Sequence, residues 1–226
     1  MEQTRRLHVY PHVEAMQSDV VSRATSLANE CINKRGAFHI VLAGGSTPQA
    51  IYRELKEIRT DWNAWHIYFG DERCLPVGDP ERNDSMALTA WLAEVPIPLD
   101  QILAIPAELG AESGARIYEA VVAKVDCFDL VLLGLGEDGH TASLFPDQLH
   151  DQAVSVVAVH DAPKAPSERI SLSAGTLSKG KNVWFLVSGE NKRETLIRWQ
   201  RGTMIPASTI RPESGVDIFT DIDLED

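Results

Sequence analysis

The sequence predicts an α/β fold with a mostly parallel central sheet and helices on both faces. Three continuous apolar runs, FHIVLA at 38–43, WHIYF at 65–69 and FDLVLLG at 128–134, each end at glycine. Such runs are typical of strands buried on both faces of a parallel sheet. Between them lie segments with apolar residues three and four positions apart, the spacing of helices that pack on a sheet. Because the 226 residues contain no repeat, low-complexity tract or linker, residues 1–226 are expected to form a single domain.

The first third of the chain predicts two strands and two helices. Residues 7–10 read as a short strand ended by proline, and residues 13–32 carry one apolar stripe of a long helix. Gly36 is expected to supply its left-handed cap. Strand 38–43 leads into GGSTP. Ser46 or Thr47 is expected to cap the next helix, with Pro48 at its first position.

The middle of the chain continues the alternation of strands and helices. Strand 65–69 runs into GDER, which is expected to be a loop, and residues 83–95 read as a helix. A short strand over 102–105 precedes a helix over 113–125. The side chains expected to face inward from these two helices are Met86, Ala90, Trp91, Val95, Ile117, Val121, Val122 and Val125.

Beyond residue 146 the pattern becomes richer in short strands. Residues 153–159, 169–173, 182–188 and 216–219 read as strands, with a proline-containing loop, HDAPKAPSE, between the first two. The segment GENK at 189–192 opens a helix that runs to Trp199.

Composition excludes several classes of function. The net charge of −12 argues against non-specific nucleic-acid binding and against attraction to anionic membranes, because both need basic patches. Three widely spaced cysteines, without CxxC or Cys/His ligand spacing, predict neither a disulfide framework nor a metal site. The first ten residues lack the apolar core of a signal peptide and no run spans a membrane. A cytoplasmic location is therefore expected, and any anionic ligand must be bound by local Arg or Lys residues.

The stretch FDLVLLGLGEDGHTASLFP, at 128–146, holds the strongest candidate site. Open α/β sheets bind ligands beyond the carboxyl ends of their strands, and glycines at 134, 136 and 139 permit sharp turns and close backbone approach. Asp138 and His140 are two residues apart there, so they can supply a carboxylate and a base to one small volume. The alternative is that the glycines only end a strand, Asp138 caps a helix and His140 lies on its solvated first turn.

Two further strand ends carry polar groups. Gly44, Gly45, Ser46 and Thr47 follow one strand and precede a helix, where free N–H groups and the helix dipole favour an anion. The segment 71–73, Asp-Glu-Arg, follows the next strand. The first segment could instead be only a well-built turn, and the second a solvated charged loop.

Taken in order, LAGGSTP, FGDER, GLGEDGHTASLFP, RISLS and SGENK resemble the 6-phosphogluconolactonase family, over about residues 42–206. The resemblance extends to a wider superfamily that includes glucosamine-6-phosphate deaminase. It implies a Rossmann-like fold and hydrolysis of 6-phospho-D-glucono-1,5-lactone in the oxidative pentose phosphate pathway. It also implies a small sugar-phosphate lactone as the ligand and no metal or organic cofactor. A monomer or weak homo-oligomer is expected.

The resemblance also suggests a role for each candidate residue. His140 would be the general base that activates water, because imidazole titrates near neutral pH. Asp138, Asp71 or Glu72 would orient it or bind sugar hydroxyls, and the N–H groups around Gly136 and Gly139 would stabilise the oxyanion. For the 6-phosphate, the candidates are Gly45, Ser46, Thr47, Arg73, Arg169 and Lys192.

Two other functions of the same fold are weighed against hydrolysis. The deaminase pattern carries a glutamate five residues beyond the histidine, where this chain has Phe145, which cannot transfer protons. A non-catalytic sugar-phosphate sensor would normally carry a DNA-binding segment, and no such extension or basic face is evident here. The chain departs from the family pattern at 81–84, where ERND keeps only Asn83, and in its acidic C-terminal end.

Overall fold

A parallel sheet of seven strands forms the centre of the computed structural model, which describes residues 3–148 and 153–224. The strand order is β1-β10-β9-β6-β2-β3-β5, and every neighbouring pair is parallel. The strands are β1 Arg5–Val9, β2 Phe38–Leu42, β3 Trp65–Phe69, β5 Ile102–Leu103, β6 Leu130–Gly134, β9 Val183–Val187 and β10 Val216–Thr220. The α/β architecture with a largely parallel sheet predicted from the sequence is confirmed.

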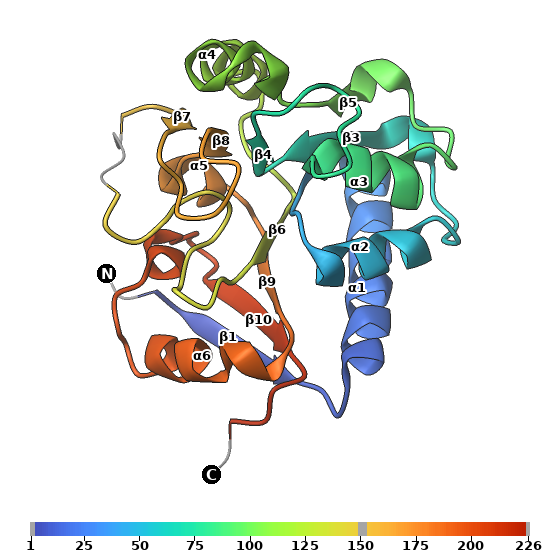
Figure 1. Ribbon diagram of the computed structural model, residues 1–226. Helices are drawn as coiled ribbons and strands as arrows, with labels where there is room; N and C mark the ends of the chain where they lie inside the picture. The colour runs from blue at the N-terminus through green and yellow to red at the C-terminus, as the bar shows by residue number, and fades with distance from the viewer. Residues whose placement is uncertain (1–2, 149–152, 225–226) are drawn as a thin grey trace.

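Helices cover both faces of this sheet (Figure 1). In α1, Val13–Arg35, the guanidinium of Arg23 lies over the ring of Phe219 on β10. On the neighbouring strand, Phe185 packs instead against Trp199 of α6, Arg193–Gln200, with ring centroids 4.7 Å apart. Phe219 pairs with Leu186, so Phe185 and Phe219 point to opposite faces of the sheet. Consequently α1 and α6 lie on opposite sides.

The polar segment after β3 is a strand, not the loop that the sequence predicted. Residues Asp71–Arg73 form β4, which pairs antiparallel with β8, Arg169–Leu172, and β8 pairs with β7, Val156–Val159. The Leu172 N–H donates to the Gly70 carbonyl at 2.8 Å and joins this small sheet to the end of β3. Helix α4, Ala111–Val122, packs against the small sheet (Figure 1). The strand was not predicted because its residues are charged and its partner strand lies about a hundred residues away in the sequence.

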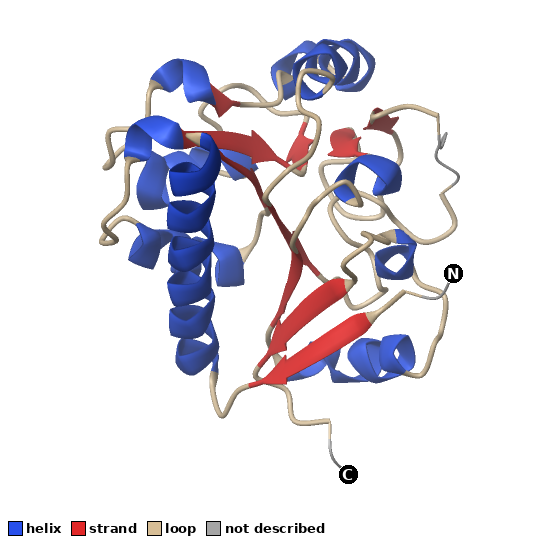
Figure 2. Cartoon of the chain, turned by 180° about the vertical axis from the view of Figure 1, so that it is seen from behind, coloured by secondary structure: helices blue, strands red, loops and turns tan. Residues whose placement is uncertain are grey.

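The helix predictions were right in place but partly wrong in detail. Helix α1, the long helix in front of the sheet in Figure 2, ends with Gly36 in the left-handed region, as predicted. Helix α2, Ser46–Leu55, is capped by Gly45 rather than by Ser46 or Thr47, so Pro48 is its third residue. On α4, Ile117 is 47% exposed instead of buried, because Tyr118 and Val122 occupy the inward face.

The predicted helix over 83–95 is divided into two pieces. Helix α3, Asn83–Ala87, continues as one wider π turn, Leu88–Leu92. The remaining short helix is α5, Ala174–Leu177. Among the described residues, no helix combines the length and the apolar character needed to cross a membrane.

The order of the strands determines where a ligand can bind. From β2 the chain builds outward through β3 to β5, and from β6 it builds in the other direction through β9 to β10. Such a reversal opens a crevice at the carboxyl ends of the two strands that flank it, here β2 and β6. The segments that follow these strands contain GGSTP and GEDGH.

Candidate active site

A cavity of about 230 Å³ lies at the carboxyl ends of β2, β3 and β6. Its walls come from segments that are distant in the sequence and adjacent in the sheet. The polar and glycine residues that line it are Gly44, Gly45, Gly70, Asp71, Arg73, Asn83, Gly134, Gly136, His140, Thr141, Lys164, Arg169 and Lys192. Eight predicted site residues therefore share one volume: Gly44, Gly45, Asp71, Arg73, Gly136, His140, Arg169 and Lys192.

The turn after β6 is folded tightly on itself. The Gly136 N–H donates to the His140 carbonyl at 2.8 Å, and the Gly139 N–H donates to the Gly136 carbonyl at 3.0 Å. A Cβ atom on Gly136 would lie 2.0 Å from Nδ1 of His140, so only glycine leaves room for the imidazole. Gly139 has φ +88° and packs against Ile205, which also requires glycine.

These same hydrogen bonds bear on one prediction. N–H groups around Gly136 and Gly139 were expected to stabilise an oxyanion, and the N–H groups of these two glycines already donate within the turn. The sequence shows which residues permit a sharp turn, and not which of their N–H groups the turn consumes. For the neighbouring N–H groups of the turn, the oxyanion role stays a prediction.

His140 is held by the carboxylate two residues before it. Nδ1 of His140 lies 2.5 Å from Oδ1 of Asp138, which also accepts the backbone N–H of His140 at 3.1 Å. Burial raises the pKa of Asp138, but these hydrogen bonds outweigh burial and lower it, so the carboxylate is ionised at neutral pH. An ionised acceptor at Nδ1 favours the tautomer in which Nδ1 carries the proton, leaving Nε2 free to accept another.

The imidazole also has an aromatic neighbour. The ring centroid of Phe145 lies 4.9 Å from that of His140. The guanidinium of Arg169 lies 5.7 Å from the centroid of the Phe145 ring. Phe145 is buried, and both His140 and Arg169 lie against its ring. The side chain of His140 is 20% exposed and contributes to the cavity surface.

Asp71 lines the cavity, but no hydrogen bond or ion pair joins it to His140. Its carboxylate accepts from the Ser143 hydroxyl at 2.6 Å and from the Asn83 amide at 3.1 Å. Asn83 donates in addition to the Asp71 carbonyl at 2.8 Å. These bonds hold Asp71 at the cavity wall, where its remaining lone pairs can accept hydroxyl donors from a ligand.

Glu72, the third carboxylate considered as a partner of His140, is far from that role. It is completely buried and does not line this cavity. It accepts the backbone N–H groups of residues 73, 83 and 84. Burial raises its pKa to about 7, although the backbone hydrogen bonds act in the opposite direction. Asp138 is thus the carboxylate that contacts the imidazole.

Four cationic side chains line the cavity in a chain whose net charge is −12. Arg169 is buried and donates to the carbonyls of Lys164, Ala165 and Pro166. Burial, and then the charge of Arg73, lowers the pKa of Arg169, but an arginine remains charged. Nε of Arg73 is buried without a hydrogen-bond partner among the described residues. Lys192 Nζ lies 3.7 Å from the Glu137 carboxylate.

The GGSTP turn contributes backbone rather than side chains to the cavity. Gly44 and Gly45 line it, and their N–H groups donate to no described residue. Ser46 lines an adjoining cavity that shares Gly45, Arg73 and Asn83 with the first. Thr47 is half-buried and lines neither cavity. The unpaired N–H groups at this helix start are suited to binding an anion.

Five of the polar and glycine residues that line the cavity were not predicted as part of the site: Gly70, Asn83, Gly134, Thr141 and Lys164. Asn83 is the residue of ERND that the family pattern retains, and that match was the available signal. Lys164 reaches the cavity because the β7–β8 connection returns over it, which requires the small antiparallel sheet to be known. In the part of the chain that the structure describes, no group of three His, Cys, Asp or Glu residues is arranged to bind a metal ion.

The sequence matches known proteins along almost its whole length. The profile of the family described as "Glucosamine-6-phosphate isomerases/6-phosphogluconolactonase" matches residues 11–219. The 6-phosphogluconolactonase of Mycobacterium leprae is 31% identical, over 97% of this chain and 95% of its own length. The chloroplastic 6-phosphogluconolactonase 3 of Arabidopsis thaliana is 31% identical, over 97% and 74%. The crystal structure of 6-phosphogluconolactonase from Thermotoga maritima superimposes with a TM-score of 0.89 at 25% identity, covering 96% of this chain and 99% of that one.

Proposed function

The chain belongs to the glucosamine-6-phosphate isomerase/6-phosphogluconolactonase family, and we propose that it hydrolyses 6-phospho-D-glucono-1,5-lactone to 6-phosphogluconate. The observation that carries the proposal is the Asp138–His140 pair beside a cavity with four cationic side chains. A base and an anion-binding surface within one cavity are what a phosphorylated ester substrate requires.

In the proposed reaction, Nε2 of His140 takes a proton from a water molecule while the water oxygen bonds to the lactone carbonyl carbon. The ionised Asp138 stabilises the imidazolium that forms. Collapse of the tetrahedral intermediate breaks the bond between the carbonyl carbon and the ring oxygen. The proton passes from His140 to that oxygen, so one water is added and the histidine is regenerated.

The phosphate of the substrate would be bound by the cationic side of the cavity. Arg169 supplies a guanidinium whose Nε and Nη2 are fixed by three carbonyl groups, and its Nη1 can donate to the phosphate. Lys164, Lys192 and Arg73 add charge, and the free N–H groups of Gly44 and Gly45 add donors. Asp71 would accept hydrogen bonds from sugar hydroxyls.

The contact between Phe145 and His140 favours hydrolysis over deamination. The position five residues after the histidine is filled by a buried phenyl ring in contact with the imidazole. A deaminase needs a titratable group in reach of the opening sugar ring, and a phenyl ring cannot transfer protons.

The proposal is tested with lactone generated in situ by glucose-6-phosphate dehydrogenase, after subtraction of spontaneous hydrolysis. His140→Ala should lower kcat by about 10²–10⁴-fold, the usual contribution of a general base. His12→Ala is the matched control, because His12 Nδ1 also lies near a carboxylate two residues away, on Glu14, and His12 lines neither cavity. Its kcat should equal that of the wild type.

Each other outcome has a definite meaning. No wild-type rate above background would refute the lactonase assignment. Binding of 6-phosphogluconate without turnover would identify a sensor, and release of ammonia from glucosamine 6-phosphate would identify a deaminase. A cytoplasmic location and a monomeric or weakly associated state belong to the same proposal and are checked by cell fractionation and size-exclusion chromatography.

A further inference from the structure

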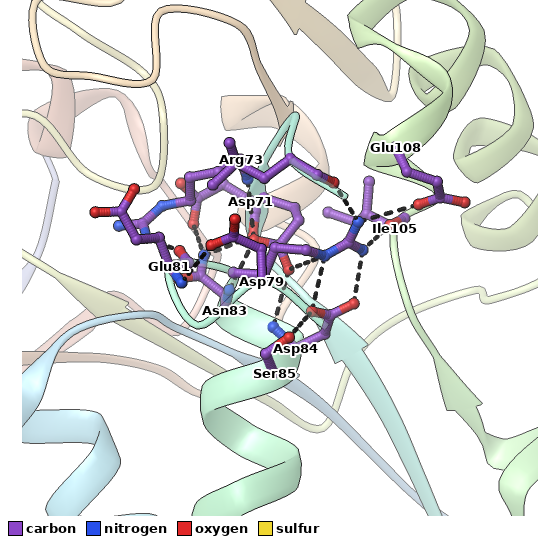
Figure 3. Close-up of polar contacts among 12 residues, drawn as sticks. Asp71, Arg73, Asp79, Glu81, Asn83, Asp84, Ser85, Ile105 and Glu108 are labelled. Atoms are coloured by element: carbon purple, nitrogen blue, oxygen red, sulfur yellow. Dashed lines mark hydrogen bonds and ion pairs between the residues drawn. The ribbon is translucent and has the colours of Figure 1, made fainter. Parts of the chain in front are cut away.

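Glu72 is a completely buried carboxylate that the reaction does not use. Oε1 accepts the N–H groups of Arg73 at 2.9 Å and Asn83 at 2.7 Å, and Oε2 accepts the N–H of Asp84 at 2.9 Å. One carboxylate therefore joins β4 to the start of α3, two elements separated by the loop 74–82. Figure 3 shows the polar contacts around this segment.

The segment that Glu72 closes carries three side chains of the cavity. Asp71 and Arg73 are its chain neighbours, and Asn83 follows the loop. Asn83 then bonds to the carbonyl and carboxylate of Asp71. On its other side, the Asn83 amide lies so close to Gly44 that a Cβ there would be 2.1 Å from Oδ1. A shift at the start of α3 would thus reach the walls formed by β2 and β4.

A second set of contacts, made by Arg82, holds the end of the loop 74–82. Arg82, buried beside Glu72, binds the carboxylate of Asp84 through two nitrogens at 2.9 and 2.6 Å, and Glu108 at 3.0 Å. It also donates to the carbonyls of Leu75 and Ile105. The nearest distance between Arg82 and Glu72 is 3.9 Å, longer than these bonds. The principal contacts of Glu72 are consequently backbone N–H groups, and Arg82 is held mainly by other partners.

We propose that Glu72 is a positioning residue that sets the geometry of Asp71, Arg73 and Asn83 in the cavity without contacting the substrate. An amide at this position would still accept on one side but would present an NH₂ donor to N–H donors on the other. The start of α3 would move away, and Asn83 would move with it. Substrate binding would weaken, while the Asp138–His140 pair, which belongs to the turn after β6, would remain in place.

The test compares Glu72→Gln with Asp84→Asn, and it rests on the proposed function. Asp84 is the matched control because it is also buried beside Arg82, yet among the described residues it accepts only from the side chains of Arg82 and Ser85. Above pH 7, Glu72→Gln should raise KM for the lactone about tenfold, equivalent to one weakened hydrogen bond to a charged group, with kcat unchanged. Asp84→Asn should raise both KM and Kd less than Glu72→Gln does. Calorimetric titration with 6-phosphogluconate should show the same rise in Kd for Glu72→Gln.

Equal KM and Kd values in the two variants would overturn the positioning role. The loss of a negative charge near Arg82, which the two variants share, would then explain the change in each. If Glu72→Gln does not fold, Asn83→Ala replaces it, since this change removes the contact between the α3 start and Asp71. An unchanged KM in Asn83→Ala would also overturn the proposal. A wild type that binds 6-phosphogluconate without turnover refutes the proposed function alone, and the calorimetric comparison still decides the role of Glu72. A wild type that neither binds 6-phosphogluconate nor hydrolyses the lactone refutes the proposed function and the positioning role of Glu72 together.

Discussion

Replacing Gly136 with alanine would add one methyl group beside the proposed catalytic pair. The new Cβ would lie 2.0 Å from Nδ1 and 2.2 Å from Cε1 of His140, and 2.6 Å from Oδ1 of Asp138. Non-bonded atoms come no closer than about 3.5 Å without repulsion, so the imidazole would have to move by about 1.5 Å. Gly136 is not among the glycines with positive φ, so its backbone conformation accepts alanine.

The expected effect is on catalysis more than on folding. A displacement of this size costs about 10²-fold in rate when the displaced group must meet the reacting atoms, so kcat should fall by about that factor. The assay is initial-rate hydrolysis of lactone generated in situ, with circular dichroism and a thermal melt to confirm folding.

Gly175→Ala is the control, because a Cβ there would approach nothing closer than Ser173 Oγ at 3.8 Å. This variant should keep full activity. A folded Gly136→Ala protein with wild-type kcat would show that the position of His140 does not limit the reaction.

Four further predictions concern Asp138, Arg169 and Glu72. Asp138→Asn should lower kcat by about 10–100-fold, as the loss of a partner that orients a histidine does, in the same initial-rate assay. Because the pKa of Asp138 is lowered in the fold, its contribution to stability is present above its unfolded pKa and is lost as pH falls through the lower folded value, which urea unfolding in acid would detect. Arg169→Lys should raise KM about tenfold at unchanged kcat, since lysine cannot keep the three carbonyl contacts that orient the guanidinium. An unchanged KM would remove Arg169 from the phosphate site. The pKa of Glu72 is raised from 4.5 to about 7, so the contribution of Glu72 to stability is present below the unfolded pKa and is lost as pH rises to 7. Over this range the unfolding free energy of the wild type should fall relative to that of Glu72→Gln by at most about 3 kcal/mol. Parallel pH profiles of the two unfolding free energies would contradict this. Arg82, Asp84 and Glu108 are the charged groups whose contacts must remain intact in that comparison.

The elements that depend on local pattern were predicted well. Strands β2, β3, β6 and β9 come from the apolar runs, and all of their residues are buried except the half-buried His39, His66 and Gly134. Helix α1 was located by its apolar stripe and by Gly36. These signals are local, because a strand covered on both faces needs apolar residues throughout and a left-handed cap needs glycine. The Asp138–His140 contact was equally local, since the two residues share one turn.

Strand β4 was not predicted, because its sequence is Asp-Glu-Arg and its partner β8 begins at Arg169. A charged triplet carries no local signal for a strand, because the hydrogen bonds that stabilise it come from a distant segment. Lys164 was missed for the same reason, since only the β7–β8 pairing brings its loop to the cavity.

The sequence by itself determined the α/β class, the strands that end at the cavity and the turn that joins Asp138 to His140. Tertiary structure decided which carboxylate does what. Asp71 is held by Ser143, 72 residues away, while Glu72, its immediate neighbour, points into the interior and joins β4 to α3. Successive residues of a strand face opposite sides, so two adjacent carboxylates enter different environments, and those environments are assembled from segments that only the folded chain brings together.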